Sequence, residues 1–211
     1  MRQRKDPGIR REEFIQAAQA LFLESGYENV TVREVLDAVG ERTSSPSVFY
    51  YYFRSKDDLY KACLGAFAGQ YLAAMREAFR EELAPMQQLS ALAKALEESL
   101  AAYGRLLSAE GAETSVPDRL VILDLRDQVT REIAELWIPL LLRLGVPQGE
   151  AVSLSRFLAG GIGELVYAFL LSQDSGEEAR HQVMRDISDL TLRTLPLPEE
   201  ERQKDHTSGG K

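Results

Sequence analysis

The sequence predicts an all-helical fold of about nine helices in two groups, a small N-terminal one and a larger C-terminal one. Apolar residues recur at intervals of three and four along most of the 211 residues, as they do on the buried stripe of an amphipathic helix. No stretch shows the sustained alternation of a half-buried strand, and no Asn-Gly hairpin signal occurs. Helix start signals are instead frequent, above all in residues 31–60.

Composition places the chain among ordinary globular proteins, with 45% hydrophobic residues. Cys63 is the one cysteine, so no intrachain disulfide can form, and we expect it to be a small buried side chain. The N-terminus is charged and no apolar signal-peptide segment follows it. No apolar run approaches the roughly 18 residues of a membrane span. We therefore expect a cytoplasmic protein.

The net charge of −8 is distributed unevenly. Residues 1–61 hold ten Lys or Arg and ten Asp or Glu, so this part is neutral and the rest carries the whole excess. A neutral N-terminal group with locally clustered cations can bind phosphates, while an acidic C-terminal group would point away from DNA.

The first eleven residues concentrate cations, namely Arg2, Arg4, Lys5, Arg10 and Arg11. Pro7 and Gly8 predict that this segment is extended until a first helix begins near Arg11 and ends at Ser25. Such an arm can follow a phosphate backbone or enter a minor groove, or it can be a solvated terminus.

Residues 31–60 carry three helix starts in succession. Thr31 and Glu34 have the form of a capping box that starts a helix, and Gly40 offers a left-handed stop for that helix. Ser45 followed by Pro46 starts a short helix that ends near Phe53. Ser55 with Asp58 starts a long one.

The short helix over residues 46–53 is expected to bury Phe49 and Phe53 against its neighbours. Ser47, Tyr50 and Tyr51 then lie on the other side, because three consecutive tyrosines on one turn cannot all be core. A short helix held by its neighbours, with small and phenolic side chains facing outward, suits a DNA major groove.

The segment VFYYYFRSKDDL, with EEFIQAAQALFLESGYENVTVREVLDAVG upstream, resembles the helix-turn-helix region of the TetR family of transcriptional regulators over about residues 9–67. The connector from Glu41 to Val48 is longer than is usual in that family. Carried over by position, the resemblance implies that DNA is contacted by Thr31, Arg33, Arg42, Ser45, Pro46, Ser47, Val48, Tyr50, Tyr51, Tyr52 and Lys56.

The C-terminal group is expected to comprise helices over about residues 55–84, 86–108, 120–144, 148–172 and 177–195, with Pro139 kinking or dividing the third of them. The domains follow as a DNA-binding head with its basic arm (1–54), a helical effector-binding and dimerisation body (55–195) and a disordered tail (196–211).

The resemblance also implies that the body encloses a small-molecule site. Its candidate lining residues, each of which is otherwise plain core packing, are Phe67, Tyr71, Met75, Tyr103, Arg126, Trp137 and Leu141, with Asp124 as a further polar anchor. In this family the last two helices pair with those of a symmetry mate, which implies a homodimer. The apolar residues expected at that interface are Leu154, Phe157, Leu158, Ile162, Leu165, Val166 and Phe169.

No active site is recognisable in the sequence. His181 and His206 are the only histidines and lie in no metal-binding pattern, and AGGIG at 159–163 lacks the spacing of a phosphate loop. We therefore expect no enzyme activity, no cofactor and no metal. The leading hypothesis is a homodimeric repressor that binds a palindromic double-stranded DNA operator and is released by a small, largely apolar effector. The alternative is a helical lipid-binding or carrier protein of the same fold that does not bind DNA. The basic arm, Lys56 and the outward tyrosines favour the repressor.

Overall fold

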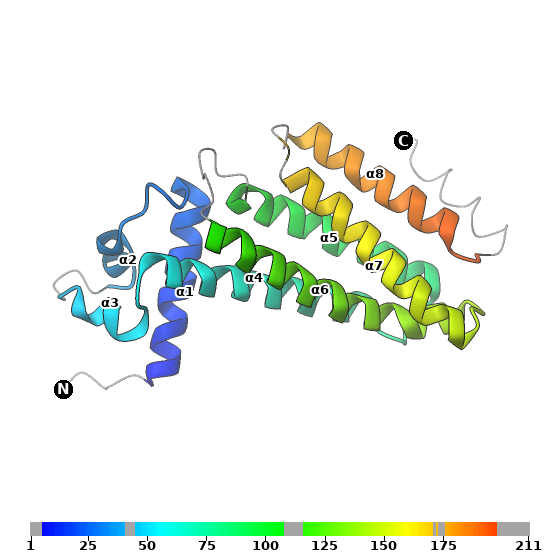
Figure 1. The fold of residues 1–211 in the computed structure, drawn as a ribbon, viewed down its shortest axis with the longest axis horizontal. Coiled ribbons are helices and arrows are strands. Elements are labelled where there is room, and N and C mark those ends of the chain that lie inside the picture. The colour runs from blue at the N-terminus through cyan, green and yellow to red at the C-terminus, as the bar shows by residue number, and fades with distance from the viewer. Residues whose placement is uncertain (1–5, 41–44, 108–115, 171, 173–175, 198–211) are drawn as a thin grey trace.

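The described part of the chain is all helical and contains no strand (Figure 1). The computed structural model describes residues 6–40, 45–107, 116–170, 172 and 176–197, and it describes the helical residues 103–107 and 116–122 by their backbone alone. The all-helical class is confirmed, with eight helices in these described residues where about nine were expected. They are α1 (Pro7–Ser25), α2 (Val32–Ala38), α3 (Ser47–Tyr52), α4 (Lys56–Ala78), α5 (Pro85–Leu107), α6 (Val116–Arg143), α7 (Gln148–Leu170) and α8 (Glu177–Thr194).

Helix α1 begins earlier than expected, so the prediction that Pro7 and Gly8 are extended was wrong. The carboxylate of Asp6 accepts a hydrogen bond from the Gly8 N–H (2.7 Å), and Pro7 occupies the first helical position, where its missing N–H costs nothing. Arg10 and Arg11 consequently lie on the helix, while residues 1–5 of the predicted arm fall outside the described residues.

Two of the three start signals of residues 31–60, at α2 and α4, are confirmed as predicted. At α2 the Thr31 N–H donates to Glu34 Oε2 (2.7 Å) while the Glu34 N–H donates to Thr31 Oγ1 (3.2 Å), which is a complete capping box. Gly40 has φ +78°, the left-handed conformation expected of a helix stop. At α4 the Asp58 N–H donates to Ser55 Oγ (3.0 Å). Helix α3 was predicted to have Ser45 at its N-cap and Pro46 in its first turn, but Pro46 is itself the N-cap and the helix begins at Ser47 without a side-chain cap.

The head, α1 to α3, shares its core with the first half of α4. Phe14, Phe22, Phe49, Phe53 and Leu59 are among the residues whose side chains are fully enclosed. The Phe49 ring meets the Phe14 ring edge-on, with centroids 6.2 Å apart. A fully buried side chain of this size contributes on the order of 1.5–3 kcal/mol, so the short helix α3 is stabilised by this packing rather than by its own hydrogen bonds.

Helix α4 ends at Ala78 rather than near Ala84, because polar side chains from elsewhere stabilise a turn over 79–84. The Gln88 amide donates to the carbonyl oxygens of Phe79 (3.0 Å) and Arg80 (2.5 Å). The Arg143 guanidinium donates to those of Glu81 (3.0 Å) and Leu83 (2.8 Å). Of the two effects expected of Pro139, a kink or a division, the division does not occur, since α6 continues through Pro139 to Arg143.

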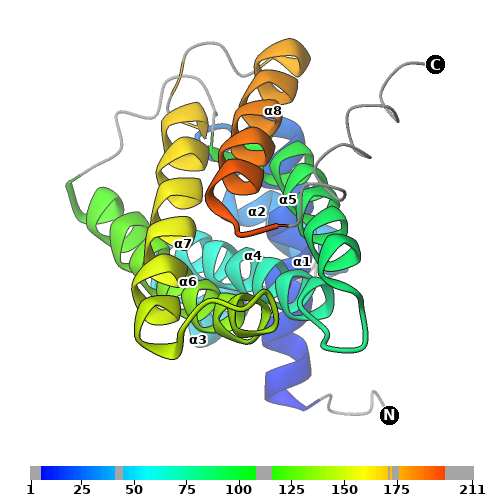
Figure 2. The ribbon, with the colours of Figure 1, turned by 90° about the vertical axis from the view of Figure 1, so that its right-hand side faces the viewer.

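The five body helices form a closed ring when viewed along the long axis (Figure 2). In order around the ring they are α4, α5, α8, α7 and α6, and each packs against the next. Trp137 of α6 is fully buried and packs edge-on against Phe79, with centroids 5.1 Å apart. Leu197, in the segment expected to be disordered, is also buried in the body core, so the ordered chain extends past Pro196. Residues 198–211 of that predicted tail lie outside the described residues.

Candidate DNA-binding face and ligand cavity

The outward side of α3 carries an exposed pair of tyrosines. Tyr50 is 57% exposed and Tyr51 71%, although both belong to a helix whose other side is enclosed. Ser45, Pro46 and Ser47 are also exposed at the start of the helix. The structure therefore brings these five predicted DNA-contacting residues together on one small surface.

The other predicted residues of α3 lie partly inside the head. Tyr52 is half-buried, with its ring centroid 5.5 Å from that of Phe14. Val48 is half-buried and packs against the head core. The expectation that three consecutive tyrosines cannot all be core is confirmed, because two face outward and Tyr52 packs inward.

The remaining predicted residues of the head differ in their freedom to contact a ligand. Thr31 is exposed, but its hydroxyl is part of the α2 cap and also donates to Glu34 (2.8 Å). Arg33 is exposed and lies in an ion pair with Asp37 (3.4 Å). Arg42 falls outside the described residues. Arg54 is an exposed cation next to α3 that was not among the predicted DNA-contacting residues. Its position directly after the short helix is a feature of the sequence that points to a contact with a DNA phosphate.

Lys56 makes contacts that its position in the sequence did not predict. Its ammonium group donates to the carbonyl oxygens of Tyr27 (3.0 Å) and Val30 (3.2 Å), and it lies 4.1 Å from the centroid of the Tyr27 ring. The Tyr27 hydroxyl in turn donates to the carboxylate of Asp57. Lys56 thus joins the start of α4 to the link between α1 and α2, and at most part of its charge remains for a phosphate.

The ring of body helices encloses a cavity of about 880 Å³. All five helices contribute to its lining, which is predominantly apolar. Of the predicted ligand-binding residues, Phe67, Tyr71, Met75, Arg126 and Trp137 line this cavity. Leu141 is fully buried in the body core instead and is not part of the lining, Asp124 is exposed, and the side chain of Tyr103 lies outside the described residues.

Polar groups are few along this cavity. Burial raises the pKa of the Tyr71 hydroxyl, so this group stays a neutral hydrogen-bonding group at physiological pH. Hydroxyl groups of Ser99, Thr130 and Ser188 also belong to lining residues. Arg126 is the one lining residue with a formal charge within the described part of the chain. A volume of this size with a mostly apolar lining is typical of sites for small organic molecules.

Residues 14–63, which span α1 to the second turn of α4, match the model of the family described as bacterial regulatory proteins, tetR family. The N-terminal part of the chain therefore matches the TetR family. The transcriptional regulator AcuR of Cereibacter sphaeroides is 31% identical over 100 residues, which are 47% of this chain and 44% of that protein. The HTH-type transcriptional repressor KstR2 of Mycolicibacterium smegmatis is 27% identical over 94 residues, 44% of each chain. The matched region is thus less than half the length of either curated relative.

Solved structures extend the similarity of fold to the body helices. A transcriptional regulator from Cytophaga hutchinsonii superposes with a TM-score of 0.71 at 16% identity, covering 91% of this chain and 100% of that one. The transcriptional regulator FadR from Bacillus subtilis, solved in complex with stearoyl-CoA, gives 0.61 at 18% identity, covering 87% and 98%. These structures confirm the all-helical architecture, and the predicted resemblance to the TetR family is confirmed over residues 14–63. The relatives are named as transcriptional regulators rather than as enzymes, in agreement with the expectation from the sequence.

Most of the apolar residues predicted at a dimer interface are enclosed within this single chain. Leu158 and Phe169 are buried. Four others are half-buried against the body cores, namely Leu154, Ile162, Leu165 and Val166. Phe157 alone is exposed, at 67%. Helix α7 therefore packs more of its surface against the rest of the chain than the spacing of its apolar residues indicates. Ile162 and Val166 also line the cavity.

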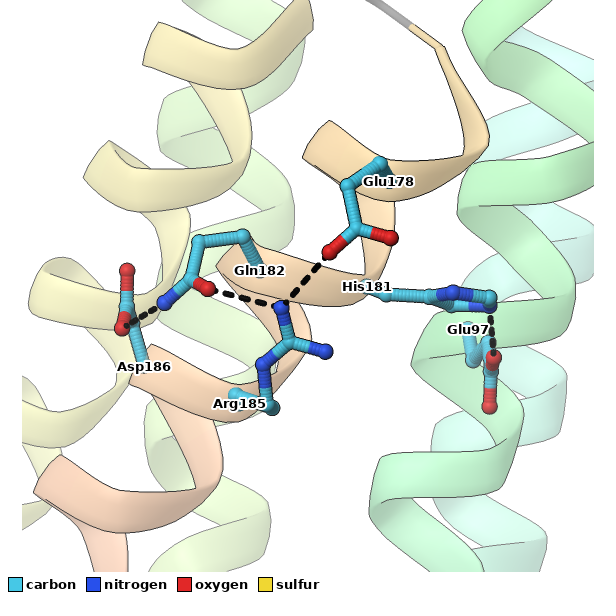
Figure 3. Close-up of polar contacts among 6 residues, drawn as sticks. All are labelled: Glu97, Glu178, His181, Gln182, Arg185 and Asp186. Atoms are coloured by element: carbon cyan, nitrogen blue, oxygen red, sulfur yellow. Dashed lines mark hydrogen bonds and ion pairs between the residues drawn. The ribbon is translucent and has the colours of Figure 1, made fainter.

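Exposed polar side chains of α8 contact one another in its first half (Figure 3). Arg185 donates to Glu178 (3.1 Å) and to Gln182 (2.7 Å), and Gln182 donates to Asp186 (2.8 Å), all of them exposed. On the side toward α5, His181 lies 3.8 Å from a carboxylate oxygen of Glu97. His181 thus lies where α8 packs against α5. Among the described residues, no group of acidic, Cys and His side chains is arranged to hold a metal ion. None of the described helices combines the length and apolarity needed to span a membrane.

Proposed function

We propose that this TetR-family chain is a homodimeric transcriptional repressor that a small, largely apolar effector releases from a palindromic DNA operator. In this proposal residues 1–54 form the DNA-binding head and residues 55–195 the effector-binding and dimerisation body. One observation carries it: the short helix α3 exposes Tyr50 and Tyr51 while Phe49 and Phe53 fix its other side in the head core. A helix held so firmly can present side chains to base edges in a major groove.

Some side chains of the head core also line the cavity. Through them, an effector bound in the cavity can change the position of the head. Leu64 and Phe67 belong to the head core and to the cavity lining, and Leu125 of α6 packs against that core and lines the cavity as well. A molecule that fills the cavity presses on residues against which the head packs. It would therefore favour a different position of α4 and of α3, and it weakens DNA binding by its unequal affinity for the two arrangements.

A second copy of the chain would pack on the outer side of α7 and α8. Phe157 and Leu190 are exposed there at 67% and 53%. A Cβ atom placed on Gly160 or Gly161 would meet nothing within 4 Å in its own chain, and neither residue has a positive φ. Interior helix glycines cost about 1 kcal/mol relative to alanine, so bare backbone beside Phe157 fits the close approach of a partner helix.

The effector is proposed to be mostly apolar because the cavity is. FadR from Bacillus subtilis, a protein of the same fold, was solved with stearoyl-CoA, whose acyl chain is of this kind. The chain matches less than half the length of its curated relatives, so their effectors are not assigned to it.

Titration of a fluorescent duplex pool with the full chain at several salt concentrations tests the DNA-binding half of the proposal. We expect affinity to fall steeply with salt, because phosphate contacts release counterions. Tyr51→Ala should weaken binding while leaving helical content unchanged. Leu142→Ala, which alters another exposed apolar side chain (43%), is the matched control and should bind as wild type does. Equal binding by wild type and Tyr51→Ala would exclude α3 as the DNA-binding element.

A further inference from the structure

Arg126 occupies an unusual place in the cavity. It is the one charged residue among the described lining residues, and its side chain is 29% exposed. The guanidinium pairs with the carboxylate of Glu164, which is 62% exposed and does not line the cavity. It also lies 4.6 Å from the centroid of the Tyr167 ring, which does line it. Arg126 therefore stands at the rim, between an apolar interior and a carboxylate on the surface.

The hydrogen-bonding capacity of this guanidinium is largely unused within the described part of the chain. An arginine carries five N–H donors in a planar fork, and here one nitrogen, Nη2, donates to Glu164. Tyr167 holds the plane of the fork by its ring. Thr130 lies one turn along α6 from Arg126 and also lines the cavity, so its hydroxyl is on the same side of the helix. A fork of this kind is suited to a carboxylate or phosphate, which it can bind with two parallel hydrogen bonds.

We propose that the effector is an amphipathic anion, whose negatively charged head binds Arg126 in place of Glu164 and whose apolar body fills the cavity. This inference rests on the proposed effector site and specifies its ligand class. A ligand that supplies its own anion keeps the Arg126 charge paired when Glu164 is displaced, while the apolar body of the ligand is removed from water. The exposed Glu164 is a weak competitor, because surface ion pairs are typically worth no more than about 1 kcal/mol.

Trp137 is the single tryptophan of the chain and lines the cavity, so its fluorescence reports binding without a label. Dodecanoate and dodecanamide, below their aggregation concentrations at pH 8, differ in head charge but share one chain. We expect the full chain to bind dodecanoate at least about tenfold more tightly, a difference of 1.4 kcal/mol. Arg126→Gln should abolish this preference. Arg131→Gln, which removes the same charge from the exposed side of α6, should preserve it.

Glu164→Gln provides a test in the opposite direction. Removing the competing carboxylate should raise the affinity for dodecanoate severalfold and leave that for dodecanamide unchanged. Glu150→Gln on the same helix, fourteen residues away, is its control and should change neither. Dodecanoyl-CoA distinguishes a free acid from a thioester: tighter binding than dodecanoate that still depends on Arg126 assigns the head to the nucleotide phosphates, and weaker binding assigns it to the free acid.

Equal binding of the acid and the amide, an unchanged preference in Arg126→Gln, or no binding of either molecule would overturn the anion site. These results are independent of the DNA-binding half of the proposed function, which is measured on α3 without any ligand. A chain that binds DNA through Tyr51 and yet binds the amide as well as the acid retains its proposed role but has a neutral effector.

Discussion

The ammonium group of Lys56 lies 3.0 Å from the carbonyl oxygen of Tyr27 and 4.1 Å from the centre of the Tyr27 ring. The sequence resemblance assigns Lys56 to a DNA phosphate, whereas these contacts assign it to the structure of the head as well. Hydrogen bonds from a charged donor contribute about 1.5–3 kcal/mol, and the ring contact adds about 0.5–1 kcal/mol. Partial exposure of the group reduces these values.

Lys56→Ala should therefore lower the free energy of unfolding by about 1–3 kcal/mol, measured by urea denaturation. Lys61→Ala, farther along α4, is the control and should change stability by less than about 0.5 kcal/mol. If Lys56 also contacts a phosphate, the folded variant loses about one unit of the salt slope of DNA binding. An unfolding free energy equal to that of wild type would contradict the structural role of Lys56.

Phe49→Ala should destabilise the head far more than any change on the outer side of α3. The Phe49 side chain is fully buried between aromatic neighbours, and its removal leaves a cavity that costs about 3–5 kcal/mol. Ser47→Ala and Tyr51→Ala should instead change the discrimination between base pairs by about 1–3 kcal/mol for each lost contact, with the unfolding transition unaltered. Thermal unfolding and DNA titrations of the same preparations separate the two effects. A Phe49→Ala protein as stable as wild type would be incompatible with the packing described for α3.

Phe157→Lys should convert the protein from dimer to monomer, because it places a charge at the centre of the proposed contact. Sedimentation velocity at micromolar concentration measures the change, and circular dichroism should give the same helical content as wild type. Leu142→Lys alters an exposed apolar side chain of α6 and serves as the control, which should remain dimeric. A wild-type protein that sediments as a stable monomer would contradict the proposed homodimer.

Cys63 should resist thiol reagents until the head unfolds. Burial raises the pKa of its thiol to about 12, with Glu12 acting in the same direction, and the thiolate is the reactive form. At pH 8 a disulfide reagent should therefore react slowly with the native protein and rapidly in guanidinium. Rapid stoichiometric labelling of the native protein would show that Cys63 is accessible.

The same pKa shift predicts a loss of stability at high pH. The native thiol holds its proton above pH 9.0, the ordinary value, where the unfolded thiol releases it. The contribution of Cys63 is thus fully present below pH 9 and is lost as the pH rises from 9 toward 12. Cys63→Ala should flatten the unfolding free energy over that range, and an equal slope in both proteins would exclude the effect.

Features set by neighbouring residues were predictable from the sequence. The Thr31–Glu34 capping box, the Gly40 stop and the Ser55 cap depend on side chains within four residues of each other, and all three occur as expected. The start of α1 differs from the prediction because proline and glycine usually interrupt helices, although Asp6 before a proline is itself a start signal.

Features set by distant contacts were not predictable. The turn over 79–84 depends on Gln88 and Arg143, and the role of Lys56 depends on carbonyl oxygens more than 25 residues earlier in the chain. Helical periodicity marked α7 as apolar but could not distinguish its buried side from an outward one, so Leu158 and Phe169 were placed at an interface while they pack within the chain. Arg126 was predicted as a polar anchor, whereas its pairing with Glu164 required the α6–α7 packing to be known.

Selection of duplexes from a random pool by the full chain, followed by sequencing, tests the central claim most directly. We expect enrichment of a palindromic site whose half-sites lie about 34–36 Å apart, about one turn of DNA, as a two-fold dimer requires. We also expect that a Tyr50→Ala, Tyr51→Ala double variant with wild-type stability loses the enrichment. A wild-type protein that enriches no sequence, or a double variant that enriches the same site as strongly, would contradict the claim that α3 reads DNA.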